Sequence, residues 1–219
     1  MKNIILIAPP AAGKGTQAKL ISSKYNIPHI STGDLLRDEI KKETDLGLKI
    51  KEDMDKGNLV SDDTIHNLLK NRLSQNDCDN GYILDGYPRS VSQAVEYDKL
   101  LNELNKELGI VIFLDINKDL ALKRTVSRII CSSCGMSYNL LSLELKPKKE
   151  GICDKCNSDL KVRSDDTEEV FFNRFDTFTH KTKDLVNFYQ DKKVLNIINV
   201  NKTKTAEDIF KEIERLLEV

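Results

Sequence analysis

The stretch IILIAPPAAGKGT, residues 4–16, decides the fold of this chain, because an apolar run leads into a loop of small residues and then into a helical pattern. Ile4–Ile7 has the composition of a buried strand. A strand, a small-residue loop and a helix N-terminus together form a site for phosphate, since backbone N–H groups converge there and the helix dipole adds positive potential. Lys14 is placed to bridge the outer phosphates.

The loop departs from the strict phosphate-binding pattern, which has glycine where this chain has Ala8. An ordinary strand-to-helix turn is the alternative interpretation. The strand on one side and the helix on the other favour the phosphate site.

Strand-like and helix-like segments alternate along the rest of the chain. Tyr82–Leu84, Ile110–Leu114 and Val194–Val200 have strand character, and His29–Ile30 has it more weakly. Between them, Ser61 is a candidate cap for an amphipathic helix, and the C-terminal segment has the same helical spacing. Parallel strands need crossover connections, so this alternation predicts an α/β fold with a mostly parallel sheet between helices. Ligands of such sheets bind at the carboxyl ends of the strands.

Two polar segments interrupt the alternation, Ser31–Val60, which is charged and helical, and Cys131–Lys161, which is rich in cysteine. Both are predicted to be appendages on the core. A chain of 219 residues is long enough for one buried domain with insertions and short for two independent domains.

Composition excludes several classes of function. Hydrophobic residues make up 39% and charged residues 32% of the chain, which is typical of a soluble globular protein. The net charge of −1 argues against a dedicated nucleic-acid binder. No apolar run approaches the roughly 20 residues of a membrane helix, and the apolar start is too brief for a secretory signal, so we expect a cytoplasmic protein without membrane partners.

Four of the five cysteines form the pattern Cys131-x₂-Cys134-x₁₈-Cys153-x₂-Cys156, which matches the spacing of a four-thiolate zinc site. Four thiolates fill the tetrahedron, so the metal would be structural. Each pair is expected in a turn, with a small β-hairpin from the intervening stretch. An iron site of the same geometry and a redox dithiol pair are the alternatives. The remaining Cys78 is interpreted as a small buried residue.

Arginine is the favoured side chain for holding phosphate bidentately, and the chain has only eight. Arg72 and Arg215 are interpreted as surface residues on helices. Any one of the other six arginines could instead be a solvated surface residue. As a set, however, they match the negative charges of two bound nucleotides: Arg37, Arg89, Arg124, Arg128, Arg163 and Arg174.

Four blocks together resemble the adenylate kinase family: Gly13-Lys14-Gly15-Thr16, Ser31-Thr32-Gly33-Asp34-Leu35-Leu36-Arg37, Leu84-Asp85-Gly86-Tyr87-Pro88-Arg89, and Arg163-Ser164-Asp165-Asp166 with Arg174. The blocks occur in the family's order and run nearly the length of the chain. The cysteine insert resembles the long, zinc-carrying lid of the family.

The resemblance implies a P-loop nucleoside-monophosphate kinase fold, with a five-stranded parallel sheet flanked by helices. It implies a core of residues 1–30, 61–126 and 167–219, a nucleoside-monophosphate-binding insertion at 31–60, and a zinc-bearing lid at 127–166. Magnesium bound with ATP and structural zinc are the implied cofactors. ATP and AMP are the implied substrates, nucleic acid is not a partner, and the protein is expected to be a monomer.

The resemblance also implies roles for single residues. Lys14, Arg124, Arg128, Arg163, Arg174 and Asp85 would serve catalysis, with Asp85 ordering the water shell of magnesium or, alternatively, acting as a structural cap. ATP would be held by Ala11, Ala12, Gly13, Lys14, Gly15, Thr16, Arg128, Ser137, Tyr138 and Lys204. AMP would be held by Thr32, Arg37, Asn58, Leu59, Val60, Gly86, Tyr87, Pro88, Arg89, Gln93, Arg163 and Arg174.

The family loop normally has glycine where this chain has Ala8 and Ala11. Two other functions remain open. Thr32 and Gln93 favour adenine within the resemblance, but a kinase acting on UMP or CMP is the first alternative. A zinc-ribbon nucleic-acid binder is the second, although acidic residues interleave with the lysines of the cysteine insert.

Overall fold

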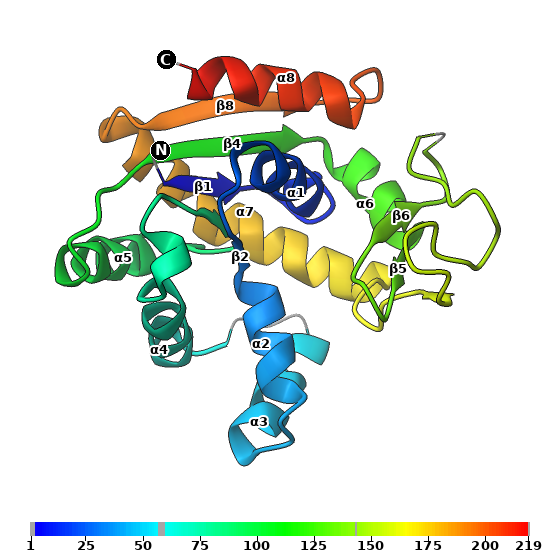
Figure 1. The fold of residues 1–219 in the computed structure, drawn as a ribbon, viewed down its shortest axis with the longest axis horizontal. Helices are drawn as coiled ribbons and strands as arrows, with labels where there is room; N and C mark the ends of the chain where they lie inside the picture. Colours follow the sequence, from blue (N-terminus) through cyan, green and yellow to red (C-terminus); the bar gives the residue numbers. More distant parts are fainter. Residues whose placement is uncertain (1–2, 57–59, 143, 219) are drawn as a thin grey trace.

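The centre of the protein is a five-stranded parallel sheet (Figure 1). The structure is a computed structural model that describes residues 3–56, 60–142 and 144–218. The strands lie in the order β2-β3-β1-β4-β8, which confirms the predicted parallel α/β fold. Their bounds are Ile4–Ile7 (β1), His29–Ser31 (β2), Ile83–Asp85 (β3), Ile110–Ile116 (β4) and Leu195–Val200 (β8). The fourth extends two residues beyond its predicted end.

Side chains of the strands alternate between two apolar clusters, one on each face of the sheet. Ile5 and Val111 face one cluster, and Ile4 and Ile112 face the other. Because both faces are covered, β1 and the first five residues of β4 appear in the sequence as continuous apolar runs.

Helices cover both faces. Helices α4 and α5 and the C-terminal half of α7 pack on the first cluster, and α1, α6, α8 and the N-terminal part of α7 pack on the second. Their bounds are Lys14–Tyr25 (α1), Asp62–Leu73 (α4), Val91–Glu103 (α5), Lys118–Val126 (α6), Glu168–Asp191 (α7) and Ala206–Leu217 (α8), with a short 3₁₀ helix at Asn76–Cys78 (η1).

The first insertion is a pair of helices, α2 (Thr32–Ile40) and α3 (Asp45–Asp55), which project from the β2 side of the molecule (Figure 1). The two helices approach closely at Gly47, where an added Cβ would lie 2.8 Å from the Glu39 carbonyl oxygen. The chain then returns to the core at α4. Ser61 precedes this helix as predicted, but its hydroxyl pairs with the Thr64 hydroxyl instead of capping a backbone N–H.

The second insertion has a three-stranded antiparallel sheet of its own, in the order β6-β5-β7. The strands are Arg128–Cys131 (β5), Ser137–Asn139 (β6) and Leu160–Lys161 (β7). Prediction placed a hairpin between the two cysteine pairs, and this was wrong: β5 and β6 form the hairpin around the first pair. The reason is the tight turn after β5, which is closed by a 2.8 Å hydrogen bond from the Cys131 amide to the Met136 carbonyl.

Within the described parts of the chain, no helix combines the length and apolar character that crossing a membrane requires.

Candidate active site

The loop between β1 and α1 has the conformation of a phosphate cradle. Gly13 precedes α1 with a φ of 98°, a left-handed value that favours glycine. No acidic residue lies in the first turn of α1, so its free backbone N–H groups and positive dipole are available to an anion. Ala11 also has a positive φ, 59°, despite its Cβ. The loop therefore keeps a glycine-type conformation at a position that carries alanine.

The Lys14 side chain folds back over this loop. Its ammonium donates to the Ala8 carbonyl over 3.2 Å and lies 4.0 Å from a carboxylate oxygen of Asp85. Ala8 is not among the residues with positive φ, so its Cβ is accommodated without strain. Burial lowers the pKa of Lys14 to about 8, with a smaller contribution from the charges of Arg89 and Arg174 and against the opposing effect of Asp85. A buried ammonium among other cations is a site that an anion would stabilise.

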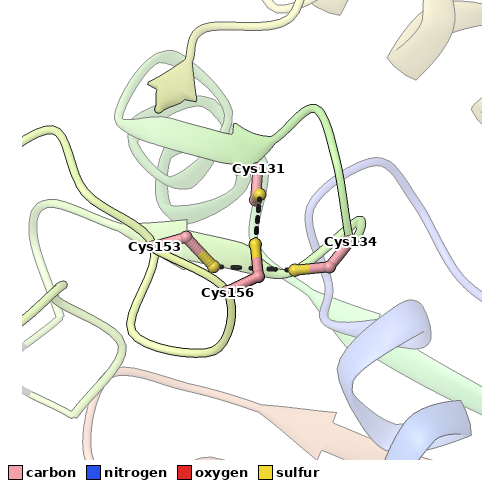
Figure 2. A group of neighbouring side chains, drawn as sticks. All are labelled: Cys131, Cys134, Cys153 and Cys156. Carbon is pink, nitrogen blue, oxygen red and sulfur yellow. Dashed lines mark hydrogen bonds between the residues drawn. The ribbon is translucent and has the colours of Figure 1, made fainter. Parts of the chain in front are cut away.

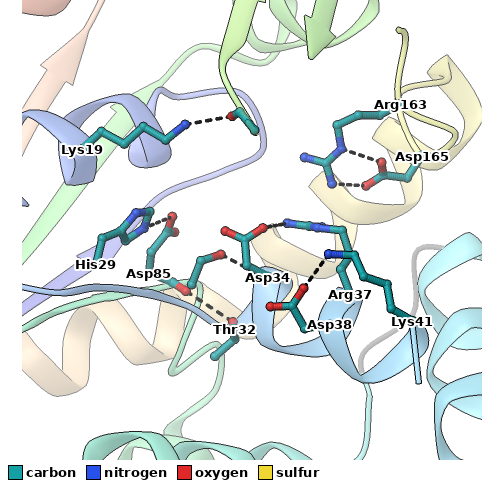
Figure 3. Close-up of polar contacts among 12 residues, drawn as sticks. Lys19, His29, Thr32, Asp34, Arg37, Asp38, Lys41, Asp85, Arg163 and Asp165 are labelled. Carbon is teal, nitrogen blue, oxygen red and sulfur yellow. Dashed lines mark hydrogen bonds and ion pairs between the residues drawn. The ribbon is translucent and has the colours of Figure 1, made fainter. Parts of the chain in front are cut away.

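Asp85 ends β3 beside the loop and is held by several partners (Figure 3). His29 contacts one carboxylate oxygen over 3.2 Å, and the Thr32 hydroxyl donates to the Asp85 carbonyl over 3.3 Å. Burial alone raises the pKa of Asp85, but the His29 hydrogen bond and the charge of Lys14 outweigh burial, so its pKa lies below the usual value. Asp85 is therefore ionised at neutral pH.

Three of the predicted arginines are paired with two adjacent carboxylates. Arg163 binds Asp165 bidentately over 2.9 and 3.0 Å, and Arg174 of α7 reaches the same carboxylate over 2.8 Å. Arg128, at the start of β5, binds Asp166 bidentately. Burial lowers the pKa of Arg174 to about 10, so this guanidinium stays charged at neutral pH. The pairs hold three cations in place at the junction of the second insertion and the core.

Gly86 and Arg89, which follow β3, form a polar wall near the phosphate loop. The Arg89 Nε donates to the Gly86 carbonyl over 2.7 Å. Gly86 has a φ of 82°, and an added Cβ there would lie 2.9 Å from the Thr32 hydroxyl oxygen, so only glycine fits. Arg37 of α2 is partly buried and pairs with Asp34 over 2.6 Å (Figure 3).

A small cavity of about 70 Å³ joins the phosphate loop to this wall. Its lining includes Pro10 and Lys14 from the loop, Gly86 and Arg89 from the wall, and Arg174 from α7. Residues that are far apart in the sequence and were predicted for two different nucleotides thus border one space. This is the arrangement that direct transfer of a group between two bound phosphates requires.

The other predicted acceptor residues lie around this wall. Tyr87 is buried and donates to the Gln93 carbonyl over 3.1 Å, Thr32 is buried behind Gly86, and Gln93 lies in the first turn of α5. Val60 borders a larger cavity of about 580 Å³ between the N-termini of α4 and α5 and the middle of α7. Asn58 and Leu59 lie outside the described residues.

Four residues predicted for the ATP side differ in their burial and in their contacts. Ser137 is exposed on β6, and Arg124 is partly buried near the end of α6. Lys204 lies in the loop before α8 and pairs with Glu212 over 2.7 Å. Tyr138 is 4% exposed, because its hydroxyl contacts the Cys153 sulfur at 3.5 Å and accepts from the Asp154 amide at 2.7 Å. The Tyr138 side chain thus lies in the interior of the second insertion. A contact between Tyr138 and ATP stays a prediction.

The four cysteines of the second insertion lie together, as Figure 2 shows, with all their sulfur atoms within 4.8 Å of one another. Cys131 and Cys156 are 3.4 Å apart, and Cys134 and Cys153 are 3.6 Å apart. A tetrahedron of zinc–sulfur bonds of about 2.3 Å has sulfur atoms about 3.8 Å apart, so the cluster fits zinc in donor type, number and spacing. The Tyr138 hydrogen bond lowers the pKa of Cys153 to about 6, which favours the thiolate that binds metal.

From the sequence, no role was assigned to Asp165, Asp166 or His29, although the two carboxylates hold three of the predicted arginines. Adjacent acidic residues next to a candidate phosphate-binding arginine were the available signal. The contact between His29 and Asp85 had no signal in the sequence, because it depends on the pairing of β2 with β3.

Comparison with known proteins places this geometry in a family. The family model described as adenylate kinase matches residues 6–194. The chain is 44% identical to the adenylate kinase of Clostridium botulinum (strain Loch Maree / Type A3), over 98% of this chain and 97% of the relative. It is 45% identical to the adenylate kinase of Archaeoglobus fulgidus, over 99% of this chain and 98% of the relative, and 43% identical to that of Clostridium tetani, over 98% of both. With a family match along most of its length and full-length relatives at this identity, the chain belongs to the adenylate kinase family.

Proposed function

We propose that this protein transfers the terminal phosphoryl group of ATP to AMP and forms two ADP, through the residues described above. Family membership makes the chain a nucleoside-monophosphate kinase. The observation that carries the residue assignment is the cavity where Lys14, Arg89 and Arg174 meet beside the phosphate loop. A buried group of cations from separate elements suits two polyanions better than one.

On the ATP side, the backbone N–H groups of 11–16 surround the β- and γ-phosphates, and Lys14 bridges their oxygen atoms. Arg128 balances the charge that spreads over the transferring group, with Arg124 in support, and Arg174 clamps phosphate together with Arg163. Asp166 holds the guanidinium group of Arg128, and Asp165 holds that of Arg174, in position before nucleotide binds. The lid residues Ser137 and Tyr138, and Lys204 of the core, complete the ATP side.

On the AMP side, Arg37 and Arg89 bind the phosphate, and Arg163 adds a third guanidinium. Thr32, Gly86 and Gln93 surround the base and sugar, together with the segment 58–60 and the Tyr87-Pro88 pair. Residues 31–60 form the acceptor-binding arm and residues 127–166 the lid, and both are attached to the core of 1–30, 61–126 and 167–219.

The reaction needs no general base, because the acceptor is already an anionic phosphate oxygen. The chain therefore contributes positioning, charge stabilisation and exclusion of water. Lys14 and the arginines hold the two phosphates in line, and so supply both the positioning and the charge stabilisation. The lid excludes water, which strengthens the electrostatic contacts and prevents hydrolysis of ATP.

Adenylate kinases use magnesium with ATP, and the ion neutralises charge on the β- and γ-phosphates when it is bound. The ionised carboxylate of Asp85 beside Lys14 fits this ion, because carboxylate oxygen is the donor that magnesium prefers. In the lid, the four thiolates would hold zinc as a structural ion, since no open position is left for substrate. We further propose a cytoplasmic monomer. No observation favours UMP or CMP as acceptor, or nucleic acid as a ligand.

The test measures ADP formation from ATP and AMP, with UMP, CMP and GMP as alternative acceptors and magnesium withheld in one arm. The Lys14→Met variant should lose about 100-fold or more in kcat while remaining folded, because the bridging ammonium is gone. Lys24→Met is the matched control: the same change on the same helix, at an exposed lysine that pairs with Glu214.

Near-normal turnover in folded Lys14→Met protein would remove the phosphate-loop assignment. A faster reaction with UMP or CMP than with AMP would change the acceptor.

A further inference from the structure

The two ends of the Gln93 amide contact groups of opposite hydrogen-bonding sense. Its Nε2 donates to a carboxylate oxygen of Asp62 over 2.6 Å, and its Oε1 accepts from the Arg89 amide over 2.7 Å. A carboxylate only accepts and a backbone N–H only donates, so exchanging the two ends of the amide would break both hydrogen bonds. The orientation of the amide is therefore fixed by its partners.

The rest of Gln93 is held as firmly. Its backbone N–H donates to the Ser90 hydroxyl over 3.2 Å, and its backbone carbonyl accepts from the Tyr87 hydroxyl over 3.1 Å. The residue is 1% exposed. The amide of Gln93 is thus preorganised, with little freedom to turn when a ligand arrives.

After these two contacts the side-chain amide still has one N–H to donate and one oxygen lone pair to accept. A 6-aminopurine such as adenine presents a donor at position 6 and an acceptor at N1, whereas a 6-oxopurine such as hypoxanthine presents the reverse. An amide of fixed orientation therefore forms hydrogen bonds with only one of these two edges. Against the other edge, its N–H faces a donor and its oxygen faces an acceptor. Such a mismatch discriminates strongly, because it leaves polar groups unpaired.

We propose that Asp62 is a positioning residue for the base of the acceptor nucleotide, fixing the Gln93 amide in the orientation that matches a 6-aminopurine. This inference rests on the proposed function, in which Gln93 contacts the base of AMP. Asp62 acts through Gln93 and need not touch the nucleotide.

The surroundings of Asp62 allow a clean test. Asp62 and Gln93 both border the cavity of about 580 Å³, so a smaller side chain at 62 leaves space that water can enter, and the variant is expected to fold. Asp63 is the next residue in the first turn of α4 and is also exposed, but its side chain makes no hydrogen bond to Gln93. Asp63→Ala therefore removes the same charge from the same helix terminus without releasing the amide.

The experiment compares kcat/KM for AMP and for IMP in the wild type and in Asp62→Ala, Asp62→Asn and Asp63→Ala. In Asp62→Ala the preference for AMP over IMP should fall about 10-fold, mainly through a higher KM for AMP, with kcat within about twofold. Asp62→Asn should keep most of the preference, because its amide oxygen still accepts from Gln93. Asp63→Ala should match the wild type, and thermal midpoints of the two alanine variants should agree.

A preference in Asp62→Ala equal to that in Asp63→Ala, or a loss in Asp62→Asn as large as in Asp62→Ala, would overturn the role of Asp62 and leave the kinase assignment standing. A wild-type protein that forms no ADP from ATP and AMP would overturn both.

Discussion

At the scale of the residue, Ala11 shows how this chain keeps its phosphate loop without the expected glycine. Its φ of 59° is left-handed, which costs an L-residue about 1 kcal/mol or more. The neighbouring Gly13 has a φ of 98° and takes the second left-handed position. The surrounding structure therefore imposes the left-handed conformation on Ala11.

We expect Ala11→Gly to leave kcat/KM within about tenfold of the wild type, or roughly 1.4 kcal/mol of barrier. Glycine relieves the left-handed strain, but it also adds freedom to the unfolded chain worth about 0.4–1 kcal/mol, so the free energy of unfolding should change by less than about 1 kcal/mol. Steady-state kinetics and denaturant unfolding measure the two quantities. A loss of activity far beyond tenfold would show that the methyl group of Ala11 has a role in the loop.

At the scale of the element, the second insertion is too small to bury an apolar core of its own. Its buried cluster is Cys131, Tyr138 and Cys153, with a few partly buried neighbours. Three short strands and two cysteine turns hold this segment together. A metal ion would supply the stabilisation that apolar burial cannot, as in other small metal-binding modules.

Removal of the metal by a chelator should therefore lower the thermal midpoint by about 5 °C or more, with recovery on adding zinc. Both arms are measured without magnesium, so that its removal has no part in the effect. Elemental analysis should find one zinc ion per chain, and none in Cys134→Ser. Cys78→Ser is the control, since this buried thiol lies outside the cluster.

Folded protein without bound metal would refute the zinc site. Bound iron in place of zinc would favour the alternative metal.

At the scale of the whole molecule, the proposed active site lies where separate elements meet. Lys14 comes from α1, Arg89 follows β3, Arg128 begins β5, and Arg174 lies in α7. Each insertion also contacts the core: Lys19 of α1 donates to the Gly135 carbonyl over 2.8 Å (Figure 3), and Asn173 of α7 donates to the Lys56 carbonyl over 2.6 Å. A net charge of −1 thus coexists with a strongly cationic centre.

This concentration of charge predicts a pH dependence. Burial and the nearby arginines lower the pKa of Lys14 from 10.5 to about 8 in the nucleotide-free protein. Since the charged form binds phosphate, kcat/KM for ATP should fall as the pH rises above about 8. Bound phosphates favour the charged form and raise the pKa of Lys14, so kcat at saturating ATP should stay level to a higher pH.

Initial rates from about pH 6.5 to about pH 9.5 separate the two profiles. Lys14→Arg keeps its charge throughout this range, so the fall in ATP binding near pH 8, measured by calorimetry, should be absent from that variant. A level kcat/KM profile in the wild type would contradict the buried setting of Lys14.

The sequence by itself determined the parallel α/β fold, the phosphate loop and the cysteine cluster. These features depend on local pattern: β-branched runs such as Ile4–Ile7, small residues before a helix, and two Cys-x₂-Cys pairs. The order of the motifs also indicated the family, which the comparisons confirmed. Roles for single residues rested on the resemblance and remain proposals.

Only the tertiary structure decided which residues share the site and which groups hold them. The contacts of His29 with Asp85, of Arg174 with Asp165 and of Gln93 with Asp62 join residues of different elements. The position of the lid hairpin depended likewise on the pairing of β5 with β6. Distances between segments are fixed by packing of the two apolar clusters on the sheet, and a single sequence carries no local signal for such packing.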